Sequence, residues 1–64
     1  MEVFLQKEGK MLEVEHEGTA KSLLEKLGVN FETVLIVKDG TLITEQDNVD
    51  GAKRIELLSV ISGG

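Results

Sequence analysis

Side chains of alternating polarity make up the first part of the chain. In residues 2–6 the apolar Val3 and Leu5 contrast with the polar Glu2 and Gln6. Residues 11–15 show the same contrast after the polar connector 7–10, with apolar residues at 12 and 14 and glutamates at 13 and 15. Successive side chains of a β-strand point to opposite faces, so a period of two is typical of a strand with one buried face. The two stretches and their short glycine-containing connector therefore predict a β-hairpin with one apolar face.

The period of the apolar residues then changes to that of a helix. Apolar residues recur at i, i+3, i+4 and i+7 in Ala20, Leu23, Leu24 and Leu27. Thr19 is placed to cap the first turn and Gly28 to end the last, which predicts one helix between them. We assign its apolar stripe to the core rather than to an interface, because so small a sheet needs a helix to cover its apolar face.

The second half of the chain has the pattern of three further strands. Residues 33–38 are mostly apolar and β-branched, Asp39-Gly40 is a strong two-residue hairpin turn, and 41–43 form the returning strand. The polar stretch 44–53 carries turn signals, and 54–61 resumes the strand pattern. The predicted order of elements is β-β-α-β-β-β.

The last predicted strand decides the fold class. Residues 55–61 are too apolar for an exposed edge, so we expect this strand in the middle of the sheet, parallel to the first. A mixed sheet covered by a single helix is the β-grasp pattern of the α+β class. We expect one β-grasp domain over residues 1–61, followed by a flexible tail at 62–64.

Size and composition exclude several classes of function. A chain of 64 residues builds one small core and has no room for a built-in catalytic cleft. It has no cysteine and a single histidine, His16, so we assign no disulfide, no metal and no cofactor. The net charge of −5 argues against nucleic acid or an anionic membrane as partner, and fits either a partner with a basic docking surface or plain solubility. With no membrane-spanning run and no secretory signal, the chain is expected to be cytoplasmic and, alone, monomeric.

The most informative feature is the end of the chain, where Ser62, Gly63 and Gly64 follow the apolar run 55–61. A strand that continues into residues without Cβ atoms can enter a narrow enzyme channel and present its terminal carboxylate to chemistry there. Such a chain would be a substrate or a carrier, and not a catalyst.

The stretch 34–43, an acidic loop and the stretch 54–64 resemble the prokaryotic ubiquitin-like sulfur carriers, and the resemblance covers nearly the whole chain. Length and ending are most similar to the thiamine-biosynthesis sulfur carriers, and the archaeal small ubiquitin-like modifier proteins are almost as close. The small subunit of molybdopterin synthase is a weaker match. Its members are usually longer and often carry prolines before the terminal glycines, whereas this chain has no proline.

The resemblance implies a sulfur carrier without catalytic residues of its own. An ATP-dependent activating enzyme would adenylate the carboxylate of Gly64, and a sulfur donor would convert the acyl-adenylate to a thiocarboxylate. Thiazole synthase in thiamine biosynthesis, or another synthase in molybdopterin biosynthesis or tRNA thiolation, would then accept the sulfur. Two alternatives stay open: a protein modifier joined through Gly64 to lysines of substrate proteins, or a plain β-grasp binding module in which the tail has no role.

A period of two also divides the last strand into two faces. Ile55 and Leu57 are expected to point to the helix, and Leu58 and Val60 to the opposite face. The resemblance implies that this apolar surface at the base of the tail docks the activating enzyme, with Glu56 adding electrostatic steering. The other interpretation is that Leu58 and Val60 pack under neighbouring strands or are simply exposed.

Overall fold

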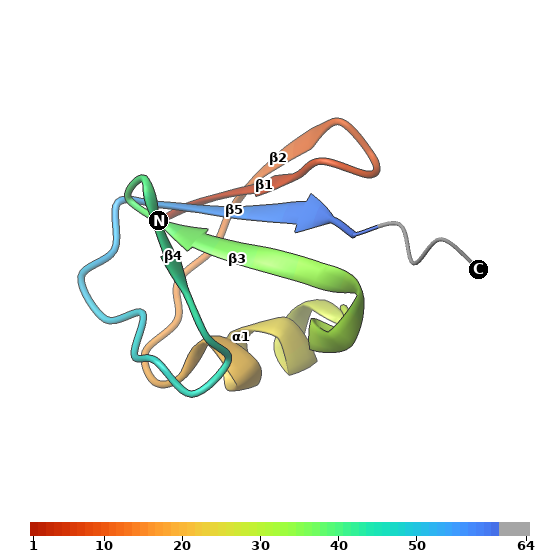
Figure 1. Ribbon diagram of the computed structural model, residues 1–64. Helices are drawn as coiled ribbons and strands as arrows, with labels where there is room; N and C mark the ends of the chain where they lie inside the picture. The colour runs from red at the N-terminus through yellow and green to blue at the C-terminus, as the bar shows by residue number, and fades with distance from the viewer. Residues whose placement is uncertain (61–64) are drawn as a thin grey trace.

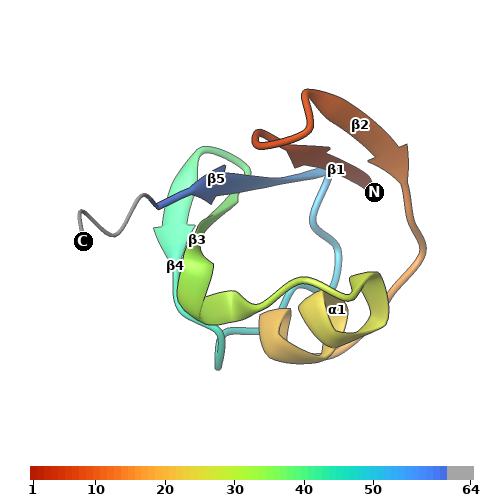
Figure 2. The same cartoon turned by 90° about the vertical axis from the view of Figure 1, so that its right-hand side faces the viewer.

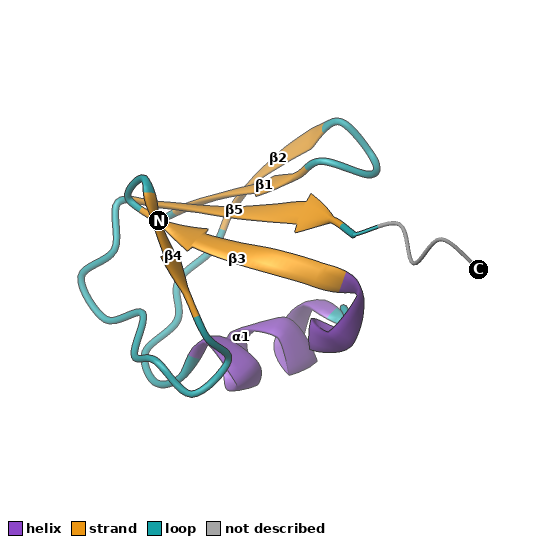
Figure 3. Cartoon of the chain, in the orientation of Figure 1, coloured by secondary structure: helices purple, strands orange, loops and turns teal. Residues whose placement is uncertain are grey.

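The computed structural model describes residues 1–60, which form one sheet and one α-helix (Figures 1 and 3). In chain order the elements are β1 (Glu2–Leu5), β2 (Lys10–Glu13), α1 (Ala20–Leu27), the 3₁₀ turn η1 (Phe31–Thr33), β3 (Val34–Lys38), β4 (Thr41–Ile43) and β5 (Arg54–Ser59). The predicted succession of two strands, a helix and three strands is confirmed. The predicted domain boundary at 61 and the predicted flexible tail at 62–64 lie outside the described residues. Within residues 1–60, no helix is long and apolar enough to cross a membrane.

The strand β5 occupies the middle of the five-stranded sheet, whose order is β2-β1-β5-β3-β4. It runs parallel to β1, with Leu5 opposite Leu57, and antiparallel to β3, with Ile36 opposite Leu57. The strands β2 and β4 form the two edges as antiparallel hairpin partners of β1 and β3. The helix α1 lies across one face of this sheet (Figure 2). The position and direction predicted for the last strand are therefore confirmed, and so is the mixed-sheet β-grasp fold.

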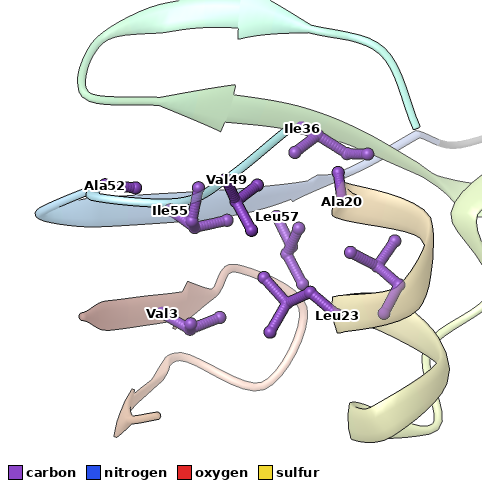
Figure 4. Close-up of a cluster of buried hydrophobic side chains, with 9 residues drawn as sticks. Val3, Ala20, Leu23, Ile36, Val49, Ala52, Ile55 and Leu57 are labelled. Carbon is purple, nitrogen blue, oxygen red and sulfur yellow. The ribbon is translucent and has the colours of Figure 1, made fainter. Parts of the chain in front are cut away.

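The core lies between α1 and the sheet (Figure 4). Its nine buried side chains are Val3 from β1, Ala20, Leu23 and Leu24 from α1, Ile36 from β3, Ile55 and Leu57 from β5, and Val49 and Ala52 from the loop between β4 and β5. The helical stripe thus belongs to the core, as predicted. The burial of the two loop residues was not predicted, because the sequence pattern indicated only a polar connection between β4 and β5. Their burial follows from a bond at the start of the helix, where the Val49 N–H donates to the Gly18 carbonyl oxygen at 2.8 Å.

Local chemistry sets the ends of α1 and the turn before β4. Thr19 caps the helix by accepting a hydrogen bond from the Ser22 N–H at 3.2 Å, and Gly28 ends it at a φ of +73°. Asp39 and Gly40 both have positive φ, at +47° and +85°, as a two-residue type I′ hairpin turn requires. Both caps and the hairpin turn are confirmed as predicted.

The boundaries predicted for the first hairpin are wrong by one or two residues. The alternation placed the second strand at 11–15, whereas β2 spans Lys10–Glu13. Glu13 lies opposite Glu2, the first residue of β1. Val14 still exchanges two hydrogen bonds of 2.9 Å with Met1, but both residues lie outside the strands. At the other end of the hairpin β1 stops at Leu5, and residue 6 already belongs to the turn.

The start predicted for the third strand is also wrong by one residue. Thr33 was expected to begin the strand, but it ends the 3₁₀ turn η1, and β3 begins at Val34. Asn30 initiates this turn, because its side-chain oxygen accepts a hydrogen bond from the Glu32 N–H at 3.0 Å. The turn carries the chain from the end of α1 into the sheet.

Candidate functional site

The candidate site is the C-terminal end of β5, from which the chain continues toward its terminal glycines. Ser62, Gly63 and Gly64, to which the sequence assigns the chemistry, lie outside the described residues. The structure places the segment that leads to them, which we call the tail root: Ser59, the last residue of β5, and Val60 directly after it (Figure 1). The strand predicted over 54–61 ends at Ser59, and residue 61 lies outside the described residues.

The tail root is held from both neighbouring strands. On the β1 side, the Ser59 N–H donates to Gln6 Oε1 at 2.8 Å. On the β3 side, the Val60 N–H donates to the Thr33 carbonyl oxygen at 3.0 Å. Sequence reasoning singled out neither Gln6 nor Thr33 as part of a site. Gln6 and Ser59 are 53 positions apart, and no local pattern connects residues at that separation.

The two faces of β5 carry different surroundings, as the period of two predicts. Ile55 and Leu57 are 0% and 2% exposed and belong to the core. Leu58 lies directly opposite Leu35 of β3, which is 47% exposed on the face away from α1. Val60 is 44% exposed. The predicted orientation is confirmed for Ile55, Leu57 and Leu58. Val60 follows the strand and lines a groove together with Val29 and Leu57, so its place on the opposite face stays a prediction.

Leu58 is part of a larger apolar surface on the face of the sheet away from α1, which we call the outer patch. Its members are Phe4, Met11, Leu35, Val37, Leu42 and Leu58. The register places Phe4 beside Met11 and Leu35 beside Leu58. Sequence reasoning identified only Leu58, the member next to the tail. The same period of two, applied to the positions between the core residues of β1 and β3, was the signal that could have found the others.

Glu56 is the acidic residue on this face of β5. It lies opposite Phe4 of β1 and Val37 of β3. The nearest counter-charge is Arg54, whose Nη2 is 3.9 Å from Glu56 Oε2 and whose guanidinium carbon is 5.8 Å from the centroid of the Phe4 ring. Ion pairs between partly exposed side chains contribute little to stability, so both charges remain free to meet a partner.

A groove of about 880 Å³ adjoins the tail root. It is bordered by the turn after β1, the segment after α1 and the end of β5, and its lining includes Gln6, Val29, Thr33, Ser59 and Val60. Both anchoring hydrogen bonds of the tail root therefore lie at the surface, where a partner can reach them. The sequence carried no signal for this groove, because its walls come from three segments that only the fold brings together.

His16 has a structural contact and forms no second site. Its Nε2 lies 2.8 Å from Ser22 Oγ, and that hydroxyl donates to the Thr19 carbonyl oxygen at 2.8 Å. The Ser22 hydroxyl has a single proton, so His16 Nε2 is the donor in the bond between them. His16 thus ties the segment before α1 to the first turn of the helix. In the part of the chain that the structure describes, no group of three histidine, aspartate or glutamate side chains is arranged to hold a metal ion.

Comparison with known proteins identifies the family. The ThiS family model matches residues 4–64. This chain belongs to the ThiS family. Its membership confirms the resemblance to the ubiquitin-like sulfur carrier superfamily, in which proteins of the ThiS type are small carriers and not catalysts.

Two relatives of this ThiS-family protein match it over most of their length. It is 42% identical over 57 residues to the Sulfur carrier protein TtuB of Thermus thermophilus, an alignment that covers 89% of this chain and 88% of that protein. It is 43% identical over 56 residues to an uncharacterized protein of Archaeoglobus fulgidus, with 86% of this chain and 82% of that protein covered. The similarity therefore extends through the whole domain and is not confined to the Gly-Gly end.

The two faces of β5 predict opposite outcomes for one substitution at adjacent positions. Leu57→Asp places a carboxylate in the core, which costs several kcal/mol and exceeds what a domain of this size can tolerate. Leu58→Asp places the same carboxylate on the outer patch and is expected to cost about 1 kcal/mol. Circular dichroism during urea titration measures both. A folded Leu57→Asp variant, or an unfolded Leu58→Asp variant, contradicts the assignment of the faces.

Proposed function

We propose that this ThiS-family protein carries sulfur as a thiocarboxylate on Gly64. The observation that carries the proposal is the Gly63-Gly64 end, which follows within five residues of Ser59, the last residue of a strand that has partners on both sides. A separate ATP-dependent activating enzyme adenylates the carboxylate, and a sulfur donor then replaces the adenylate. The 42% identity to a protein described as a sulfur carrier supports this function.

The chemistry explains why the chain needs an activating enzyme. A carboxylate is a poor electrophile, because its oxygen leaves only after conversion to a better leaving group. Attack of the Gly64 carboxylate oxygen on the α-phosphate of ATP releases pyrophosphate and forms the acyl-adenylate. Attack of a hydrosulfide equivalent on the acyl carbon then forms the C–S bond, and AMP departs. Glycine at the last two positions lets the backbone approach the nucleotide without side chains in the way.

We place thiazole synthase of thiamine biosynthesis first among the sulfur acceptors, because the length and ending of the chain are most similar to that branch of the superfamily. Synthases of molybdopterin biosynthesis and tRNA thiolation follow. In each case the protein is the carried substrate of three partners, namely the activating enzyme, the sulfur donor and the accepting synthase. We expect this chemistry to take place in the cytoplasm.

The second candidate function is that of a protein modifier. The same activated acyl group of Gly64 can be captured by a lysine of a substrate protein, which forms an isopeptide bond. The Gly-Gly end on a β-grasp domain favours this candidate as well, and the resemblance to the archaeal small modifier proteins points the same way. The two functions differ only in the nucleophile, so one chain can serve both.

We further propose that the outer patch, with Leu58 and Glu56 and with Val60 of the tail root, is the docking surface for the activating enzyme. Three observations support this role. The patch is apolar and exposed, it is continuous with the tail root, and it carries one acidic residue that fits the net negative charge of the chain. A partner that seats itself on this face would have the end of the chain directly at hand.

The first prediction concerns the terminal glycine. Gly64→Ala is expected to reduce thiocarboxylate formation by at least about tenfold, because the added methyl group restricts the backbone and widens the segment that enters the enzyme. The assay incubates isotopically labelled protein with soluble extract of the native cells, ATP and sodium sulfide. Intact mass spectrometry then follows the replacement of one oxygen by sulfur.

A matched control adds the same methyl group elsewhere. Gly51→Ala has open space around the new Cβ, and its positive φ of +73° costs about 1 kcal/mol of stability without touching the tail root. It is expected to be activated like the unmodified chain. Equal thiocarboxylate yields from Gly64→Ala and Gly51→Ala contradict the role of Gly64. If deletion of Gly63 and Gly64 changes nothing that the protein does, the tail has no role, and the chain is a plain β-grasp binding module.

The second prediction concerns docking. Leu58→Asp is expected to raise the apparent KM for activation about tenfold in the same assay, because a central apolar contact is replaced by a charge that must be desolvated. Met11→Asp makes the same kind of change at the margin of the outer patch farthest from the tail root, on the edge strand β2 two strands away from β5, and is expected to raise the apparent KM less than about threefold. Equal effects of the two substitutions, or no effect of Leu58→Asp in a folded protein, contradict the assignment.

A further inference from the structure

The end of β5 is held on its β1 side by a side chain that stands in for a backbone group. The parallel pairing begins with the Glu2 N–H donating to the Lys53 carbonyl at 3.0 Å and reaches the Gln6 N–H, which donates to the Leu57 carbonyl at 3.1 Å. In such a ladder the next bond runs from the Ser59 N–H to the Gln6 carbonyl oxygen. Instead, the Gln6 side-chain oxygen accepts this N–H at 2.8 Å.

The reason for the substitution is the turn that follows β1. The chain bends directly after Leu5, and the Gln6 carbonyl oxygen accepts the Gly9 N–H at 3.2 Å, which closes the turn. The Gln6 carbonyl oxygen therefore points into the turn and does not accept the Ser59 N–H. The carboxamide of Gln6 extends the ladder by one bond beyond the last backbone pair, Leu5 with Leu57.

The bond lies where the paired part of the chain ends. On the β3 side the Val60 N–H has its own acceptor, the Thr33 carbonyl, and Thr33 is fixed in turn by bonds from its N–H and hydroxyl to the Asn30 carbonyl at 3.1 and 2.8 Å. Among the described residues 1–60, the β1 side holds Ser59 through Gln6 alone. Loss of its carboxamide would leave Ser59 anchored through β3 alone and free to separate from the end of β1.

We propose that Gln6 is a positioning residue for the activation of Gly64. The inference rests on the proposed function, and it names a residue that orients the chain leading to Gly64. By holding Ser59 the carboxamide fixes the direction in which the chain leaves the sheet, so the protein meets the activating enzyme with its tail root already in the bound conformation. Preorganisation of this kind lowers the entropic cost of association.

The consequence is a specific kinetic signature. Gln6 is at the surface, and water can replace its bond to Ser59, so loss of the carboxamide leaves the fold intact. The fraction of molecules with an ordered tail root falls, and the apparent affinity falls by the same fraction. A neutral hydrogen bond of this type corresponds to a change of about 2- to 10-fold. The effect therefore appears in the apparent KM and leaves the maximal rate unchanged.

The test compares three variants. Gln6→Leu keeps the approximate size of the side chain and removes the acceptor, whereas Gln6→Glu keeps an acceptor oxygen for the Ser59 N–H. Gln46→Leu makes the same glutamine-to-leucine change in the exposed loop after β4, which lies on the side of the molecule away from the end of β5 (Figure 1). Amide hydrogen exchange by NMR reports on the Ser59 bond in each variant, and conversion of labelled protein to thiocarboxylate in the native-cell extract gives KM and maximal rate.

In the Gln6→Leu variant, Ser59 exchange and apparent KM are both expected to rise about 2- to 10-fold, with the maximal rate within twofold of the unmodified chain. The Gln6→Glu and Gln46→Leu variants are expected to match the unmodified chain. An unchanged KM in the Gln6→Leu variant overturns the positioning role. So does a Gln6→Glu variant whose KM rises as much as that of the Gln6→Leu variant. If the unmodified chain itself forms no thiocarboxylate, the proposed function fails as well, and the two failures are thereby distinguished.

Discussion

The pairing of β5 between β1 and β3 is the constraint on which the rest of the structure depends. β5 contributes Ile55 and Leu57 to the core, and through its two neighbours it links the first hairpin to the second. A strand in this position cannot shift its register by one residue without turning its core side chains toward solvent. The chain after Val60 therefore continues from the central strand of the sheet, and its starting point is set by the same contacts that stabilise the fold.

This arrangement separates three tasks along one strand. The side chains that face α1 supply stability. The outer patch is the surface proposed for a partner, and the C-terminal end leads to the carboxylate proposed to react. ThiS-type proteins are small carriers and not catalysts, and under the proposed function the chemistry takes place in the enzymes that the carrier visits. The separation also means that the outer patch can be changed without loss of the core, as the burial of Leu57 beside the partly exposed Leu58 indicates.

Much of the fold could be predicted because it is encoded locally. The helical period between Thr19 and Gly28 and the Asp39-Gly40 turn are short-range signals, and each appears in the structure as predicted. The central place of β5 followed from its apolar sequence. What could not be predicted depends on residues brought together from far apart. Val49 is in the core because the loop after β4 is bonded to the start of α1, and Gln6 reaches Ser59 across 53 positions. The chemistry proposed for Gly64 lies outside the described residues and rests on the sequence pattern and its resemblance to known carriers.

The most direct test of the central claim is the intact mass of the protein isolated from its native cells without a tag on its C-terminus. The account predicts a species in which one oxygen of the Gly64 carboxylate is replaced by sulfur. Examination of larger conjugates in the same sample detects any Gly64 joined to lysines of other proteins, which is the product of the modifier function. Gly64 found only as a free carboxylate, under conditions in which sulfur is being transferred in the cell, would contradict the account.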